Sequence, residues 1–200
     1  MKVREFHDVS DLPTWGFRSS TPWWGTLAFM TIEGTAFAIL IGAYLYLAAV
    51  DPHWPPTNAP ANPWPGTALV LLLLASLWPN WWTNRAAERQ DLRRVRIALI
   101  VMSLIGLAAI AARGLEIALV GLRWDINAYG SMVWIVLGLH ATHLVTDVAD
   151  TLVLTALMFT RHAQPRRFSD VTDNAFYWYF VVASWLPLYA LIYWFPYLAR

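Results

Sequence analysis

The chain has 200 residues, of which 58% are hydrophobic and only 14% are charged, and its formal net charge is +1. A soluble domain carries about 25% charged residues, so this composition excludes an ordinary soluble protein and predicts one that crosses a membrane several times. The chain has no cysteine, which excludes disulfides, thiolate metal sites, covalently attached haem and a cysteine nucleophile.

The first predicted span covers residues 23–50 and follows a polar tail, residues 1–22. Glu33 is the only charged residue in that span. A carboxylate within the ~30 Å hydrocarbon core of a bilayer costs on the order of several kcal/mol unless it is protonated, paired or hydrated. Glu33 must therefore face other helices. It is either a neutral carboxyl hydrogen-bonded to a neighbouring helix or a functional carboxyl linked to protons or lipid.

Four further apolar stretches follow, so we expect an all-α membrane domain of five helices over residues 23–200. Six prolines between residues 51 and 66 predict an extended connection after the first span. Polar loops rich in arginine are expected over residues 83–96 and 160–174. The five predicted spans are residues 23–50, 66–82, 97–120, 129–159 and 175–198.

Basic residues are unevenly distributed among the segments that connect these spans. The N-terminal tail and the two polar loops hold eleven of the 14 lysines and arginines. Cytoplasmic loops of membrane proteins are enriched in these two residues. We therefore expect the N-terminus in the cytoplasm and the C-terminus in the periplasm.

Two histidines and two aspartates in the fourth span, His140, His143, Asp147 and Asp150, are spaced three, four and three residues apart. This spacing places them on one helical face. Metal ligands must converge on a point, which a straight stripe does not do, so the pattern favours a buried polar seam over a metal site. At ~1.5 Å per residue, Glu33 and His143 lie at similar depth in the membrane. We expect these two to contact each other, with His140 a turn away as a further polar group of the proton-linked or structural set.

Two groups of charged residues lie nearer the ends of the spans. Arg113 and Glu116 are three residues apart and predict a structural ion pair near the membrane interface. Three arginines of the last loop face the cytoplasm in the predicted orientation. There they either bind anionic phospholipid headgroups or simply belong to a basic cytoplasmic loop. These are Arg161, Arg166 and Arg167.

Several short motifs occur in order along the chain. I-E-G-T-A-F surrounds Glu33, W-P-P covers residues 54–56, G-L-H-A-T-H covers residues 138–143, and L-I-Y-W-F lies close to the C-terminus. Together they resemble subunit III of the haem–copper respiratory oxidases, in its five-helix bacterial form. The chain departs from the family in the fifth span, where Tyr179 and Val182 replace a histidine and an aspartate. Asp147 and Asp150 also stand where apolar or small residues are usual.

The resemblance implies a non-catalytic accessory subunit of the bacterial inner membrane. Such a subunit has no cofactor of its own and contacts subunit I directly, while haem and copper lie in partner subunits, subunit II among them. It binds phospholipid and supports proton uptake or oxygen access. Two alternatives stay open: a similar accessory subunit of a nitric oxide reductase, and a small proton or ion channel that uses Glu33 and His143. Nothing in the sequence suggests nucleic-acid binding.

The predicted orientation places the C-terminal Arg200 in the periplasm. A reporter enzyme that is active only in the cytoplasm should therefore be inactive when it is fused after Arg200. The same reporter fused ahead of Met1 should be active. Activity of the Arg200 fusion would show that the orientation is reversed.

Overall fold

The structure, a computed structural model, describes residues 21–55, 61–160 and 166–198, without the side chains of Thr21, Arg166 and Arg167. Every regular element in these ranges is helical. Most of the N-terminal tail and all of Arg161 lie outside the described residues. The helices are α1 (Thr21–Val50), α2 (Pro63–Glu88), α3 (Leu92–Leu119), α4 (Ala128–Met158), α5 (Arg166–Tyr189), the π-helical η1 (Ala190–Trp194) and α6 (Phe195–Leu198).

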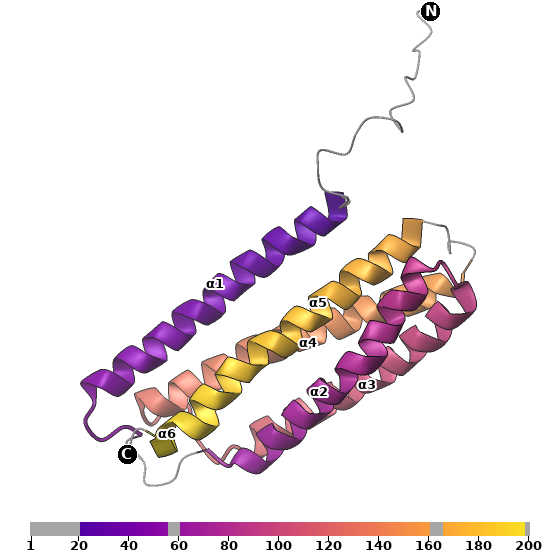
Figure 1. Ribbon diagram of the computed structural model, residues 1–200. Coiled ribbons are helices and arrows are strands. Elements are labelled where there is room, and N and C mark those ends of the chain that lie inside the picture. The colour runs from indigo at the N-terminus through magenta and orange to yellow at the C-terminus, as the bar shows by residue number, and fades with distance from the viewer. Residues whose placement is uncertain (1–20, 56–60, 161–165, 199–200) are drawn as a thin grey trace, which may run out of the picture.

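Helices α2, α3, α4 and α5 pack side by side as a bundle (Figure 1). Neighbours in this bundle are α2 with α3, α3 with α4, α4 with α5, and α5 with α2. α1 packs on one side of it, against α4 and α5. Two helices from the second half of the chain, α4 and α5, therefore line the inner face of α1.

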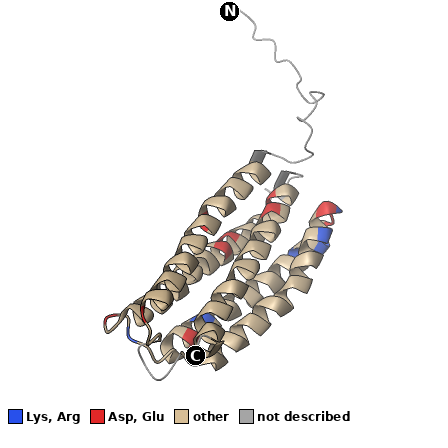
Figure 2. Cartoon of the chain, turned by 60° about the vertical axis from the view of Figure 1, so that its left-hand side comes forward, with Lys and Arg blue, Asp and Glu red and all other residues tan. Residues whose placement is uncertain are grey.

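Four helical segments are long and apolar enough to cross a membrane, judged by length and composition. Charged residues gather mostly towards the helix ends (Figure 2). The prediction of an all-helical fold is confirmed, and four of the five predicted spans lie in helices with the length and apolar character that crossing a membrane requires. α2 is not among them, because its second half contains Pro79 and Asn80 and ends in charged residues. The four segments are Pro22–Val50, Leu92–Leu119, Ala128–Met158 and Phe168–Leu198.

The loop predicted over residues 83–96 is wrong, because α2 continues to Glu88 and α3 begins at Leu92. Arginine and glutamate have good helix propensities, so a polar stretch here extends both helices beyond their apolar parts. The side chain of Asp91 caps α3 by accepting a hydrogen bond from the Arg94 backbone N–H at 3.1 Å. The remaining turn is short, and Gln90 adopts a φ of 54° in it.

The two other predicted connections are also shorter than expected. α2 begins at Pro63, inside the proline-rich stretch. Proline is tolerated there because the N–H groups of a helix's first turn have no acceptor within the helix, so the N–H that proline lacks is not missed in the hydrogen-bonding pattern. The side chain of Asn62 caps this start by accepting from the Trp64 N–H at 3.3 Å. α5 begins at Arg166 rather than near residue 175. The polar residues at the start of α5 therefore belong to a helix, not to a loop.

Gly106 sets how closely α3 approaches α4. A Cβ atom added at residue 106 would lie 2.7 Å from Cγ2 of Val148 on α4. That is far inside van der Waals contact, and the stiff valine side chain has little freedom to move aside. The close contact of these two helices therefore requires glycine at this position.

Gly106→Ala should destabilise the bundle by about 1–3 kcal/mol, the usual cost of overpacking a core. The free energy of unfolding of the purified chain in detergent micelles measures this. Gly114→Ala on the same helix is the matched control, because nothing lies within 4 Å of its new Cβ atom. Alanine has the better helix propensity, so the control should be neutral or stabilising. Equal stabilities of the two variants would contradict the close approach.

Candidate functional site

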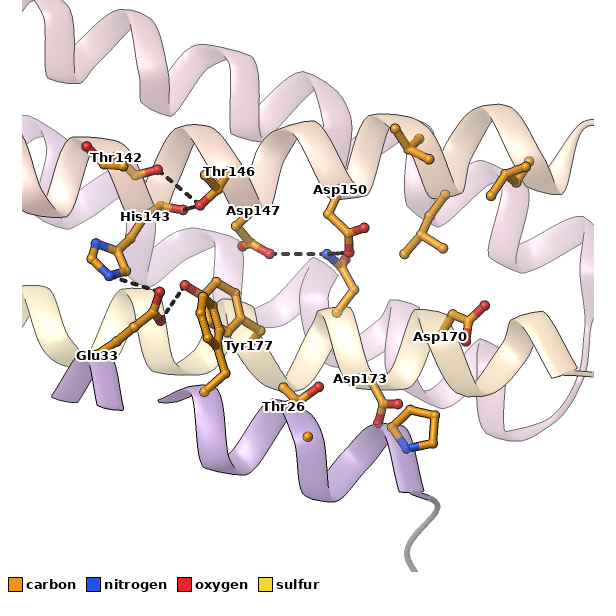
Figure 3. A pocket seen from close by; sticks show the side chains of 17 residues that line it. Thr26, Glu33, Thr142, His143, Thr146, Asp147, Asp150, Asp170, Asp173 and Tyr177 are labelled. Carbon is orange, nitrogen blue, oxygen red and sulfur yellow. Dashed lines mark hydrogen bonds and ion pairs between the residues drawn. The ribbon is translucent and has the colours of Figure 1, made fainter. Parts of the chain in front are cut away.

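A pocket of about 950 Å³ lies between α1, α4 and α5 (Figure 3). Apolar side chains such as Phe29 of α1 and Leu154 of α4 form part of its wall. Among the described residues, its lining contains five carboxyl side chains and no lysine or arginine. The pocket is therefore acidic as well as apolar. The five carboxyl residues are Glu33, Asp147, Asp150, Asp170 and Asp173.

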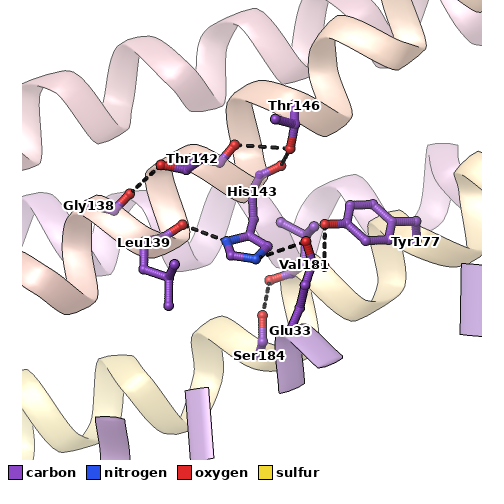
Figure 4. A network of polar contacts seen from close by, with 9 residues as sticks. All are labelled: Glu33, Gly138, Leu139, Thr142, His143, Thr146, Tyr177, Val181 and Ser184. Atoms are coloured by element: carbon purple, nitrogen blue, oxygen red, sulfur yellow. Dashed lines mark hydrogen bonds and ion pairs between the residues drawn. The ribbon is translucent and has the colours of Figure 1, made fainter. Parts of the chain in front are cut away.

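Glu33 contacts side chains from two other helices at one end of this pocket (Figure 4). Its Oε1 atom lies 3.1 Å from Nε2 of His143 on α4. Its Oε2 atom accepts a hydrogen bond from the Tyr177 hydroxyl on α5, at 2.6 Å. The predicted contact between Glu33 and His143 is confirmed, and both side chains are largely buried.

The hydrogen bonds of His143 show how many protons this pair holds. Its Nδ1 atom lies 2.6 Å from the Leu139 carbonyl oxygen, and a carbonyl only accepts, so Nδ1 carries a hydrogen. Nε2 then either accepts from a protonated Glu33 or donates to its carboxylate. In both cases one proton lies between Glu33 and His143, and the pair carries no net charge. A membrane interior tolerates such a neutral pair far better than a lone charge.

Asp147 and Asp150 share the side-chain amide of Asn174. Its Nδ2 group donates to Asp147 Oδ1 and to Asp150 Oδ2, each at 3.1 Å. The predicted polar seam on α4 is confirmed in that His143 and Asp147 are buried against other helices, while Asp150 is exposed. No group of three or more acidic, histidine or cysteine residues in the described ranges is arranged to hold a metal ion.

A second polar network lies inside the bundle, around Arg113. The predicted ion pair is present, with Arg113 Nη1 2.5 Å from Glu116 Oε2. It does not lie at an exposed boundary, since the two side chains are 3% and 0% exposed. Tyr193 of η1 donates to Glu116 Oε1 at 2.6 Å, and the guanidinium carbon lies 3.8 Å from the Trp185 ring centroid. Aromatic side chains of the last helical segment thus cover the pair.

His140 belongs to this second network, and of the two roles predicted for it, proton-linked or structural, its contacts fit the structural one. Its Nδ1 atom lies 2.8 Å from Arg113 Nη2, and its Nε2 atom lies 3.0 Å from the Val181 carbonyl oxygen. Arginine only donates and a carbonyl only accepts, so Nδ1 is bare and Nε2 carries the hydrogen. Both ring nitrogens are occupied in a neutral imidazole. His140 is therefore a structural residue.

The sequence analysis does not identify four polar members of the site, all of which lie on α5. They are Asp170, Asp173, Asn174 and Tyr177. Tyr177 is only two residues inside the predicted fifth span, about 3 Å in depth, whereas Glu33 lies far deeper in the first span, so depth along a span does not indicate this contact. Asn174 lies in a stretch that the sequence predicts as a loop, where depth along a span indicates nothing.

Arg113→Met should destabilise the chain by about 3–5 kcal/mol, because it leaves the buried Glu116 carboxylate without a counter-charge. Unfolding in detergent micelles measures this, and the double variant Arg113→Met, Glu116→Leu should recover much of the loss. Arg123→Met is the control. Arg123 and Asp125 both lie in the segment that connects α3 to α4, where hydrogen bonds from Arg123 lower the pKa of Asp125. Because this pair is exposed, its loss should have no measurable effect on stability. Equal effects of the Arg113 and Arg123 variants would contradict the assignment.

Comparison with known proteins covers almost all of the chain. The family model described as "Cytochrome c oxidase subunit III" matches residues 20–197. Cytochrome c oxidase subunit 3 of Thermostichus vulcanus is 24% identical over 172 residues, which cover 84% of this chain and 85% of the relative.

Two other relatives are similar over most of this chain. A probable cytochrome c oxidase subunit 3 of Mycobacterium tuberculosis is 25% identical over 173 residues, covering 84% of this chain and 85% of the relative. Cytochrome c oxidase subunit 3 of Pongo abelii is 27% identical over 179 residues, covering 86% of this chain and 68% of the relative. The family match spans the whole pocket and both polar networks, and this chain therefore belongs to the cytochrome c oxidase subunit III family.

Proposed function

We propose that this chain is the non-catalytic accessory subunit III of a haem–copper terminal oxidase. The family match over residues 20–197 carries this proposal. The relatives named above are cytochrome c oxidase subunits, which favours oxygen over nitric oxide as the electron acceptor of the complex and disfavours an independent ion channel. Haem and copper are then held by partner subunits, including subunits I and II.

The proposed location is the inner membrane of a bacterial cell, in direct contact with subunit I. Bacterial relatives and four helical segments with the length and apolar character of membrane spans support this location. Many large apolar side chains on the outer helix faces are exposed, for example Ile39 on α1 and Leu104 on α3. Surfaces of this kind are suited to lipid or to a partner's helices rather than to water.

The proposed role of the site is to support proton uptake by the catalytic subunit. The single observation behind it is the contact of Glu33 with His143 and Tyr177, which holds one proton between Glu33 and His143. Proton transfer needs groups that gain and lose a proton close to one another. The five carboxyls in the lining favour protons over oxygen, since an apolar gas would be better accommodated by an apolar channel.

Phospholipid binding is a separate part of the proposal. Arg161, Arg166 and Arg167 follow the C-terminal end of α4 or open α5, and each basic side chain near a membrane surface contributes about 1 kcal/mol of attraction to anionic headgroups. The side chains of these three residues lie outside the described part of the structure. Their support therefore comes from the sequence and from charge complementarity alone.

Glu33→Gln should leave the oxidase complex assembled but slow its turnover, most strongly at high pH. Glutamine keeps the shape and can hydrogen-bond, but it cannot pass a proton on, and this loss matters most where free protons are scarce. Oxygen consumption by the purified complex from low to high pH measures the effect, with haem absorbance as the check on assembly. Glu88→Gln is the control, since Glu88 is exposed on α2 beside Arg85. A Glu33 variant with normal turnover at every pH would leave the pair with a structural role only.

A further inference from the structure

Two aspartates in the pocket each have a buried carboxyl oxygen without a hydrogen-bond partner. Asp147 on α4 is 3% exposed and Asp173 on α5 is 9% exposed. In both, the Oδ2 atom makes no hydrogen bond within the part of the chain that the structure describes. Both side chains line the pocket that contains Glu33 (Figure 3). A buried carboxyl oxygen in this situation needs a proton or a donor.

Asp147 is also close to a second carboxyl. Asp150 follows one helical turn later on the same face of α4, and the Asn174 amide bridges the two. An amide nitrogen has two hydrogens, so it satisfies one oxygen of each carboxyl and leaves the others. Neighbouring carboxylates that lack a counter-charge cannot both remain ionised, and one of them takes up a proton.

Among the described residues, the other titratable groups that line the pocket with this pair supply no counter-charge. α1 contributes Glu33, α4 contributes His143, and α5 contributes two aspartates and a tyrosine. His143 is the only base among these described groups, and it is already paired with Glu33. The groups from α5 are Asp170, Asp173 and Tyr177.

We propose that Asp147 and Asp150, bridged by Asn174, form a second proton-binding site that supplies the Glu33–His143 pair. This inference rests on the proposed role in proton uptake and names the residues that deliver the proton. The site adds two carboxyl groups of α4 to the Glu33–His143 pair on which the proposed function rests.

The transfer consists of acid–base steps only, and no electron moves. A proton from the aqueous side forms an O–H bond on Asp150 or on the free Oδ2 of Asp147. That bond breaks as Glu33 takes the proton, after the proton shared with His143 has passed to an acceptor of the catalytic subunit. Asp147 is four residues after His143, so it lies one turn from the pair. A pocket of about 950 Å³ has ample room for water, which needs roughly 30 Å³ per molecule and carries protons between carboxyls.

The test uses the purified oxidase complex with the variants Asp147→Asn, Asp150→Asn and Glu33→Gln, and the double variant Asp147→Asn, Glu33→Gln. Two quantities are measured: turnover as a function of pH, and the infrared carbonyl band of protonated carboxyl groups. Asp150 is exposed, so Asp150→Asn tests the site even if Asp147→Asn fails to assemble. Asp125→Asn is the control, because Asp125 is exposed and lies in the connection between α3 and α4, away from the pocket lining.

We expect Asp147→Asn and Asp150→Asn each to slow turnover several-fold at high pH and much less at low pH. Each should also remove or shift a protonated carboxyl band, which a purely structural residue would not do. Because the two sites act in series, adding Asp147→Asn to Glu33→Gln should slow turnover no further. The control should leave turnover and the band unchanged.

Two results would overturn the inference, and they differ from a failure of the proposed function. If both aspartate variants keep normal turnover and an unchanged band while Glu33→Gln is slow, the second proton site is wrong and the role of Glu33 stands. If the aspartate variants are slow and Glu33→Gln is normal, the aspartates do not supply Glu33, and the proposed role of the pair fails as well.

Discussion

The buried ion pair between Arg113 and Glu116 is the interaction on which the rest of the bundle depends. An isolated charge inside a membrane protein is costly, so Arg113 has to be surrounded by groups that accept its hydrogens or its charge. Glu116, His140 and the face of Trp185 do this from α3, α4 and α5. Tyr193, in the π-helical η1, completes the set by donating to Glu116. Few relative positions of these helices satisfy all of the contacts at once, which is how one ion pair fixes the arrangement of three helices.

The same helix α4 carries two histidines, three residues apart, whose roles are opposite. His140 is held between an arginine and a carbonyl, so its tautomer is fixed and its one ring proton, on Nε2, is donated to the Val181 carbonyl. His143 has a carbonyl on one nitrogen and the Glu33 carboxyl on the other, so the proton between them can sit on either partner. The residue type is identical in both places. Its chemistry is decided by what the neighbouring helices place against each ring nitrogen.

The position of α1 explains why the site is where it is. α1 packs against α4 and α5 at one side of the bundle, and the pocket lies between these three helices. Glu33 can therefore be paired with His143 and Tyr177 while it still faces a space that holds other carboxyls. If the space beside Glu33 were filled by packed side chains, the Glu33–His143 pair could have only a structural role. The open pocket is what makes transfer of the proton physically reasonable.

Membrane character, the helical fold and the pairing of Glu33 with His143 can all be predicted from the sequence. The length of an apolar stretch and the position of a polar residue within it are properties of a single helix, and both can be obtained by counting residues in the sequence. Tertiary structure decided what depends on several helices together. It assigned His140 to Arg113 and not to Glu33, brought Tyr177 and Asn174 to the pocket, and placed the Arg113–Glu116 pair in the bundle interior. It also turned polar stretches into helix ends, because helix propensity continues where apolar character stops. Which face of a helix meets which neighbour is set by packing across the whole bundle, and no single stretch of sequence contains that information.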